Sequence, residues 1–342
     1  MRDYRPRSCL RVAQHHLDAP RFEVVDAHNH LGRWLSADGR WVVEDVGALL
    51  DTMARTRTRS IVNLDGRWGG ELEANLDRYD RANHGRFATF CQLDWREARS
   101  RGFGERLAVS LERSVGSGAR GVKVWKDLGL HVTDDRGDWL FADDERLAPV
   151  WQRAGELDVP VLIHSGDPVA FFEPVDPFNE RLEELLANPA WSFADPRFPR
   201  FERLIEVLEA TVAAHPATTF IGAHAVFPED LRWVARMLDT YPNFNVDIAA
   251  RVAELGRQPN AARRLMLDHP DRVLFGLDLF PPAAEDYALC WRFLETADEH
   301  FAYSNDEVPP QGRWAISGLS LPDHVLEAVY ATNALRLVPG LA

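Results

Sequence analysis

The sequence predicts an α/β protein that folds as a (β/α)8 TIM barrel, with residues 1–342 forming one domain. Eight short apolar runs alternate with stretches in which apolar residues recur at helical spacing. The runs are rich in Val, Ile, Leu and Phe without strict alternation, which is typical of parallel strands buried on both faces. No GxGxxG motif follows the first run, so an open, doubly wound sheet is disfavoured.

The predicted strands follow one another at residues 24–28, 60–64, 87–93, 121–125, 159–164, 219–224, 243–248 and 272–277. Between them, sets such as Leu231, Val234 and Leu238 show the spacing that indicates a helix. Pro160 and Pro216 lie at or just before the fifth and sixth strands, where the preceding helix has to end. Each helix is therefore expected to connect two neighbouring parallel strands.

Two segments depart from this alternation. Residues 165–200 exceed an ordinary connection and follow a strand end, where barrel sites form, so we expect a lid or pocket wall. Phe171 and Phe172 are predicted to line the pocket; the alternative is that they only brace the rim. A helix-like stretch at 179–187 predicts partial order. The tail predicts C-terminal helices at 284–301 and 322–336 with irregular chain between them.

Charge and cysteine content exclude several classes of partner. The chain has 39 Lys and Arg against 53 Asp and Glu, a formal net charge of −14. Such a surface repels phosphate backbones and anionic lipids, so neither nucleic acid nor a membrane is an expected partner. No run reaches the roughly 18–20 apolar residues of a membrane span.

Cys9, Cys91 and Cys290 form no CxxC pair, so we expect free thiols and a cytoplasmic protein. A homo-oligomer is compatible with the sequence.

Residues able to bind a metal end four of the predicted strands. The first strand runs into His28 and His30, whose imidazoles lie on one face of an extended chain. His164 ends the fifth strand, His224 ends the sixth, and Asp278 follows the eighth. Barrel topology gathers strand ends into one ring. Because imidazoles and carboxylates bind divalent ions, this pattern predicts a metal centre at the barrel mouth.

Two further residues stand near these strand ends. If Val122 and Val124 of the fourth strand face the helices, Lys123 faces the mouth. As an ammonium group Lys123 would bind a substrate carboxylate, and it would bind metal only if its charge were removed. Asp26, two residues before His28, either orients the site from behind or makes a buried hydrogen bond at the strand end.

Five motifs, DAHNH, GVKVW, VLIHSGDP, FIGAH and FGLDLF, resemble those of the amidohydrolase superfamily. The sequence is most similar to its amidohydrolase-related branch. That branch also contains metal-dependent decarboxylases of the aminocarboxymuconate-semialdehyde type and dicarboxylate lactonases. The resemblance covers residues 24–337, and the order of the motifs makes it specific for the superfamily but not for a reaction.

The resemblance implies a role for each matching residue. His28, His30 and His164 match metal ligands. Asp278 matches an aspartate that lies at the metal and moves a proton. His224 matches a histidine that binds a second metal in binuclear members and acts on substrate in mononuclear members.

The resemblance also favours one metal over two. Lys123 falls near a lysine that bridges two metals once carbamylated, but this position is often unmodified in the branch, and Lys126 leaves the register ambiguous. Zinc is the expected ion, although manganese or iron would also fit the donors. Such an ion lowers the pKa of bound water toward ~7. Asp278 is suited to take the proton, and His224 to polarise a carbonyl oxygen.

Basic and aromatic residues just after strand ends predict a small, anionic substrate. These residues are Arg33, Trp34, Trp125, Lys126 and Arg251.

The sequence therefore favours a metal-dependent hydrolase that cleaves a C–N or lactone C–O bond of a small carboxylated molecule. One alternative is a non-oxidative decarboxylase that uses the same ligands. Others are a lactonase that works without metal and a barrel that binds a ligand and catalyses nothing. A binding barrel would be free to lose His28, His30, His164, His224 and Asp278, and all five are present.

Overall fold

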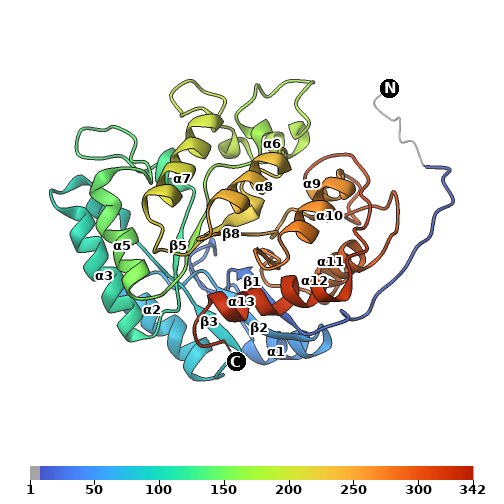
Figure 1. Cartoon of the computed structure of the whole chain (residues 1–342), viewed down its shortest axis with the longest axis horizontal. Coiled ribbons are helices and arrows are strands. Elements are labelled where there is room, and N and C mark those ends of the chain that lie inside the picture. The colour runs from blue at the N-terminus through green and yellow to red at the C-terminus, as the bar shows by residue number, and fades with distance from the viewer. Residues whose placement is uncertain (1–7, 342) are drawn as a thin grey trace.

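The computed structural model describes residues 8–341, which form the predicted barrel of parallel strands (Figure 1). The strands are β1 (Val24–Asn29), β2 (Thr58–Asn63), β3 (Phe87–Thr89), β4 (Cys91–Gln92), β5 (Val122–Val124), β6 (Val161–Ile163), β7 (Phe220–Gly222), β8 (Phe244–Asp247) and β9 (Val273–Leu274). All eight predicted runs contain strand, and the third is divided into β3 and β4.

The strands form sheets of three and six members, and backbone contacts connect the two sheets on both sides. β3 and β4 are separated by Phe90 alone, so they follow one path along the barrel wall. On the other side, Ala27 N of β1 donates to Phe275 O at 3.0 Å, and Asp278 N donates to His28 O at 2.9 Å. The chain after β9 therefore forms backbone hydrogen bonds with β1, and these bonds close the barrel.

Helices lie around the outside of the strands (Figure 1). They are α1 (Val46–Arg55), α2 (Gly69–Leu76), α3 (Phe103–Ser117), α4 (Asp127–Leu130), α5 (Ala148–Glu156), α6 (Leu182–Ala187), α7 (Phe201–Ala214), α8 (Leu231–Thr240), α9 (Val252–Leu255), α10 (Pro259–Asp268), α11 (Ala284–Glu295), α12 (Asp323–Glu327) and α13 (Asn333–Leu337). The predicted helix 284–301 ends early, at Glu295, because the chain turns there to bury Asp298 against Arg292 at 2.8 Å.

The core has an inner and an outer layer. Val25, Leu162 and Ile221 belong to the apolar cluster inside the barrel, which also contains Ala334 of α13. Asn333 of α13 donates to the carbonyl oxygens of Pro270, before β9, and of Val273, its first residue. The C-terminal helix thus packs against the amino-terminal end of the barrel, and the polar residues occupy the carboxyl end.

Three sequence-based expectations are settled by these features. Residues 165–200 contain α6 and short helical turns at Val169–Phe171 and Pro189–Trp191, so their predicted partial order is confirmed. Cys9, Cys91 and Cys290 are free thiols. Within the described range, no helix is both long enough and apolar enough to cross a bilayer.

Candidate metal centre

Two histidines at the end of β1 are held by buried carboxylates. His28 Nδ1 lies 2.8 Å from Asp247 Oδ2 at the end of β8. His30 Nδ1 lies 3.0 Å from Asp65 Oδ1, just after β2. Because a carboxylate accepts hydrogen bonds, each ring carries a proton on Nδ1, and in its neutral form it presents a lone pair at Nε2. Although burial lowers it, Asp65 and Asp278 raise the pKa of His30 to about 9, so its Nε2 has to release a proton when an ion binds. Carboxylates in this position orient metal-binding imidazoles and raise their basicity.

Asp278 brings a further carboxylate to the two Nε2 atoms. Its Oδ1 lies 3.3 Å from His30 Nε2 and 3.8 Å from His28 Nε2. Donor atoms of the three residues all lie within 4.8 Å of one another. Ligands of a tetrahedral zinc ion stand about 3.3 Å apart, so this donor set fits a divalent ion. Burial opposes ionisation, but the imidazoles of His28, His30 and His224 hold the pKa of Asp278 well below its usual range.

His224 lies beside this donor set. Its ring centroid is 4.6 Å from that of His28, and its Nε2 is 3.8 Å from Asp278 Oδ2. Its Nδ1 lies 2.9 Å from the carbonyl oxygen of Ala249, which can only accept. The neutral ring therefore has its proton on Nδ1 and an acceptor at Nε2. In that form His224 is suited to accept a proton or hydrogen bond, not to polarise a carbonyl by donating one.

The backbone is left-handed where His224 and Asp278 leave their strands. The angle φ is 61° at His224, 55° at Ala225, 58° at Val226 and 56° at Asp278. A non-glycine residue in this region costs about 1–3 kcal/mol, and such residues gather at functional sites. The fold keeps this strain where the two side chains converge on the β1 histidines.

His164, at the end of β6, neighbours His224. Their ring centroids are 4.5 Å apart, and His164 Nε2 lies 3.5 Å from Asp167 Oδ1. Burial lowers the pKa of His164 to about 4. Residues 8–341 contain one more group of donors as close as the first, His28, His224 and Asp247. That group is already bonded internally, since Asp247 accepts from His28 Nδ1 and His224 N. His164 belongs to neither group, and its role as a ligand stays a prediction.

The alternation expected for the fourth predicted strand is confirmed. Val122 and Val124 belong to the core between strands and helices. Lys123 lies on the other face, is 1% exposed, and places Nζ 3.4 Å from His28 Nε2. Burial lowers the pKa of Lys123 to about 8. Among the described residues it forms no ion pair within 4.0 Å.

Two of the predicted substrate-binding cations already have carboxylate partners. Arg33 Nε lies 3.0 Å from Glu71 Oε1. Lys126 Nζ lies 2.5 Å from Asp167 Oδ2, and this bond also ties the start of the 165–200 segment to the end of β5. A substrate anion would have to displace these carboxylates to use either cation.

Two other candidates are less fully satisfied. The Trp125 ring lies 4.8 Å from the His30 ring and 4.5 Å from the Trp34 ring. Arg251, just after β8, is 8% exposed and donates from Nη1 to its neighbour Ala250 O at 3.0 Å. Its Nε has no partner within the described part of the chain. A buried guanidinium that has no carboxylate partner among the described residues is the group that a substrate carboxylate would satisfy.

The 165–200 segment packs both on itself and on neighbouring helices. Phe171 is 3% exposed and belongs to a small apolar cluster. The other buried members of that cluster are Leu130, Leu185, Phe193 and Leu204. The Phe172 ring lies 5.3 Å from the Phe193 ring. This packing agrees with the bracing alternative, and the pocket-wall role of Phe171 and Phe172 stays a prediction.

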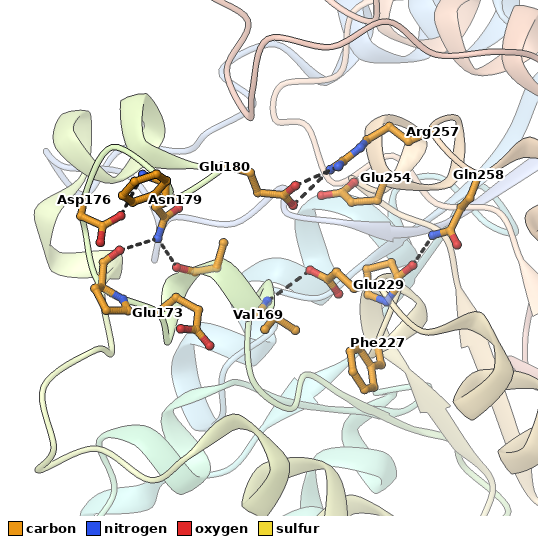
Figure 2. Close-up of a pocket in the computed structure, with 14 residues that line it drawn as sticks. Val169, Glu173, Asp176, Asn179, Glu180, Phe227, Glu229, Glu254, Arg257 and Gln258 are labelled. Carbon is orange, nitrogen blue, oxygen red and sulfur yellow. Dashed lines mark hydrogen bonds and ion pairs between the residues drawn. The ribbon is translucent and has the colours of Figure 1, made fainter.

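A cavity of about 980 Å³ separates this segment from the loops after β7 and β8 (Figure 2). Val169 and Glu180 line it from the segment, and Glu229 and Arg257 line it from the opposite side. Arg257 pairs with Glu180, and Val169 N donates to Glu229. Within residues 8–341, none of the close donor groups contributes to the cavity lining, so this cavity is not the candidate metal centre.

We expect Phe171→Ala to lower the free energy of unfolding by about 3–5 kcal/mol, because the ring is buried in its own cluster. The KM of the folded fraction should change little. Urea unfolding and steady-state kinetics measure the two quantities. Phe178→Ala is the matched control, since Phe178 lies on the same segment and is 94% exposed. A raised KM with unchanged stability would instead support the pocket wall.

Asp247 and Asp65 were missed by reasoning from the sequence. Asp247 lies in the predicted strand 243–248, and Asp65 directly follows the strand 60–64. The rule that a polar residue ending an apolar run belongs to the site applies to both. Gly276 was missed as well. A Cβ at this position would stand 2.7 Å from His28 Cβ, so only glycine leaves room for His28.

Asp26 joins the ends of the first and last strands. Its Oδ1 accepts hydrogen bonds from His28 N at 3.2 Å and Leu277 N at 2.9 Å. Its Oδ2 accepts from Asn29 Nδ2 at 2.8 Å and from the Tyr287 hydroxyl at 2.9 Å. Burial raises the pKa of Asp26 to about 6. The residue makes a buried strand-end hydrogen bond and, through it, positions the backbone of the site.

The fold and these donors define a class of protein, the (β/α)8 barrels with histidine and carboxylate groups at the carboxyl ends of their strands. The chain belongs to the amidohydrolase family, since the family model described as amidohydrolase matches residues 25–340. The resemblance read from the sequence motifs is thereby confirmed. None of the curated proteins compared with the chain matches it.

Solved structures share the fold over most of the chain. A 2,6-dihydroxybenzoate decarboxylase from Rhizobium is 16% identical, with a TM-score of 0.59 over 92% of this chain and 98% of that chain. A TIM-barrel protein from Bordetella bronchiseptica is 12% identical, with a TM-score of 0.56 over the same shares. An amidohydrolase from Burkholderia multivorans, solved with bound zinc, is 18% identical, with a TM-score of 0.53 over 92% and 98%. At these identities the likeness concerns the fold.

Proposed function

We propose that this protein is a metal-dependent hydrolase that cleaves a C–N or lactone C–O bond of a small carboxylated substrate. The observation that carries the proposal is the convergence of His28, His30 and Asp278, whose donor atoms lie within 4.8 Å of one another. The two imidazoles are buried, whereas the Asp278 side chain keeps 20% of its surface exposed. Asp278 is therefore the member of the set that solvent or substrate can reach.

One divalent ion, with zinc expected and manganese or iron also compatible, would be held by His28, His30 and Asp278, with His164 as a further ligand. When bound, such an ion polarises a carbonyl oxygen and lowers the pKa of water toward about 7. A second ion bridged by a carbamylated Lys123 is the less favoured arrangement. The unmodified ammonium group is suited to hold a substrate carboxylate.

Asp278 performs the proton transfer in this proposal. Its pKa lies well below the usual range, so it is a carboxylate at neutral pH. Because a low pKa makes it a weak base, it would accept a proton only from water that the bound ion has made more acidic. The same group then returns the proton to the leaving nitrogen or oxygen. His224, with its acceptor Nε2 3.8 Å from Asp278 Oδ2, orients the water or a substrate hydroxyl beside it.

Substrate binding is assigned first to Arg251 and Trp125, each of which has a buried nitrogen without a hydrogen-bond partner among residues 8–341. In the described part of the chain, nothing bonds to the buried Nε of Arg251, so Arg251 is the first choice for the substrate carboxylate. Trp125 supplies an apolar face beside His30. Arg33 and Lys126 also bind the substrate if its anionic group displaces the carboxylates of Glu71 and Asp167.

A second candidate reaction is non-oxidative decarboxylation, in which Asp278 takes a proton from water and passes it to the carbon that loses the carboxyl group as CO₂. The observation that favours it is a cleft beside the donor set that is lined by Trp34, Trp68, Trp95 and Trp125. Indole rings suit an aromatic acid. A metal-free lactonase and a binding barrel without activity are the remaining alternatives.

We expect the protein purified without chelator to hold about one equivalent of a transition metal, and its removal to abolish turnover. Elemental analysis measures the metal, and a screen of lactones, amides and aromatic acids, with CO₂ release recorded, identifies the reaction. CO₂ release without hydrolysis would replace the hydrolase by the decarboxylase. Turnover by protein that contains no stoichiometric metal would leave the metal-free lactonase.

A further inference from the structure

A second cavity lies at the opposite end of the barrel from the candidate metal centre. It has a volume of about 430 Å³ and is formed where β1, β2 and β3 begin, beside the last turn of α1. The six residues of β1 separate Glu23, which lines this cavity, from His30 of the donor set. A ligand bound here would therefore take no part in the chemistry at the barrel mouth.

The charge of this cavity is opposite to that of the protein as a whole. Its charged or imidazole-bearing lining residues are Glu23, Arg57, Arg59, His84 and Arg86. Three guanidinium groups thus accompany one carboxylate, although the chain contains 53 acidic and 39 basic residues. A concave site that gathers cations raises the local concentration of small anions.

Carboxylates leave the three guanidinium groups largely uncompensated within residues 8–341. Arg57 and Arg86 form no ion pair within 4.0 Å there. Arg59 Nη1 lies 3.6 Å from Oε2 of Glu23, a side chain that is 62% exposed. A solvent-exposed pair at this distance contributes little to stability, so an anion can take the place of the Glu23 carboxylate.

Backbone carbonyl groups hold two of these arginines in position without cancelling their charge. Arg57 Nη1 donates to Pro20 O and Arg21 O, both at 3.1 Å. Arg86 Nε donates to Arg59 O at 2.7 Å. Because a guanidinium has five N–H donors, each keeps others for a ligand. A planar guanidinium fixed in this way recognises a phosphate group with two parallel hydrogen bonds.

The backbone beside α1 also fits an anion site. Arg57 follows the C-cap residue Thr56, and its φ is 53°. Glycine is favoured at this left-handed position, so the chain places a guanidinium at the cavity in spite of backbone strain. Helix carbonyl oxygens that would repel an anion are covered, since Thr56 N donates to Thr52 O at 3.0 Å and Arg57 N to Ala54 O at 3.4 Å.

We propose that this cavity is a binding site for a phosphate-type anion, which is held by Arg57, Arg59 and Arg86. Three guanidinium groups match an anion with two or more negative charges better than they match a monocarboxylate. The shared chemistry is the phosphate group, whether it is free or part of a nucleotide. Because the folded barrel alone brings these arginines together, the bound anion would stabilise the fold.

The test uses inorganic diphosphate and ADP as probes on the full chain, by calorimetry and thermal unfolding. An ionic strength of about 0.15 M screens attraction between distant charges. One diphosphate should bind per chain and raise the Tm. Arg59→Met should weaken the Kd by about tenfold or more, as the loss of a charge-assisted hydrogen-bonded pair predicts. Arg57→Gly should do the same with no added backbone strain.

Two further variants serve as matched controls. Glu23→Gln removes the one acidic residue that lines the cavity in the described part of the chain, so it should tighten binding. A loss of stability would not have that effect. Arg55 lies in the last turn of α1 but outside the lining, so Arg55→Met should leave the Kd unchanged.

The proposal is overturned if the wild-type chain does not bind diphosphate. It is also overturned if Arg59→Met and Arg57→Gly both bind like wild type, because diphosphate bound to a metal at the barrel mouth would be insensitive to these changes. Equal, arginine-dependent affinities for the two probes would support a free phosphate-type anion. Tighter, arginine-dependent binding of ADP would support a nucleotide.

Discussion

Asp278→Asn is expected to lower kcat by about 10²–10⁴-fold, the range that general acid–base groups contribute, while metal content changes little. The amide keeps an oxygen near the two Nε2 atoms that lie 3.3 and 3.8 Å from the carboxylate. It cannot accept a proton from water at neutral pH. Elemental analysis and steady-state kinetics on the same preparation measure the two quantities.

Asp268→Asn, an exposed change of the same kind on α10, serves as the control and should leave both quantities unchanged. Near-normal turnover in Asp278→Asn would remove Asp278 as the proton carrier. Loss of the metal together with activity would make Asp278 chiefly a ligand.

Asp247→Ala is expected to weaken both the fold and the metal centre. Its carboxylate accepts from His28 Nδ1 at 2.8 Å, from His224 N at 2.9 Å and from Ala249 N at 3.0 Å, all in the buried interior. Leaving buried donors unpaired costs about 1–3 kcal/mol each, so the free energy of unfolding should fall by about 3 kcal/mol or more. Metal affinity should fall by about 10–100-fold, because nothing then orients the His28 ring.

Asp247→Asn separates the two effects. The amide oxygen can still accept the backbone hydrogen bonds, so urea unfolding should show a smaller loss of stability. If the amide nitrogen donates to His28 Nδ1, the ring proton moves to Nε2 and removes the lone pair that a metal needs. Titration with zinc should therefore show weakened binding in a folded protein. Wild-type zinc affinity in this variant would contradict the role assigned to Asp247.

The barrel was predictable because its strands are buried on both faces and their apolar runs stand out against polar loops. The predicted strand and helix boundaries that were wrong are those that depend on tertiary contacts. The division of the third strand at Phe90 reflects which neighbour each half pairs with, β2 or β5, and spacing contains no such information. The helix predicted to reach residue 301 ends at Glu295, because Asp298 is drawn inward to Arg292 and His15.

The candidate site was predictable where strand order alone brings residues together, as for His28, His30 and Asp278. Pairings were not predictable. Arg33 and Lys126 look like free cations in the sequence, yet their partners lie 38 and 41 positions away. With 53 acidic residues in the chain, no pattern selects Glu71 or Asp167.

The carboxylate of Asp26 has a consequence for how the protein is made. It bonds the backbone of His28 to that of Leu277, which lies 251 positions after Asp26 in the chain. During synthesis, the β1 histidines therefore leave the ribosome long before Asp247 and Asp278 exist to complete the donor set. Because such donors bind tightly only once they are brought together, an emerging chain has no reason to retain the ion. Metal acquisition is thus expected to be a late event that stabilises finished barrels and leaves incomplete chains without its protection.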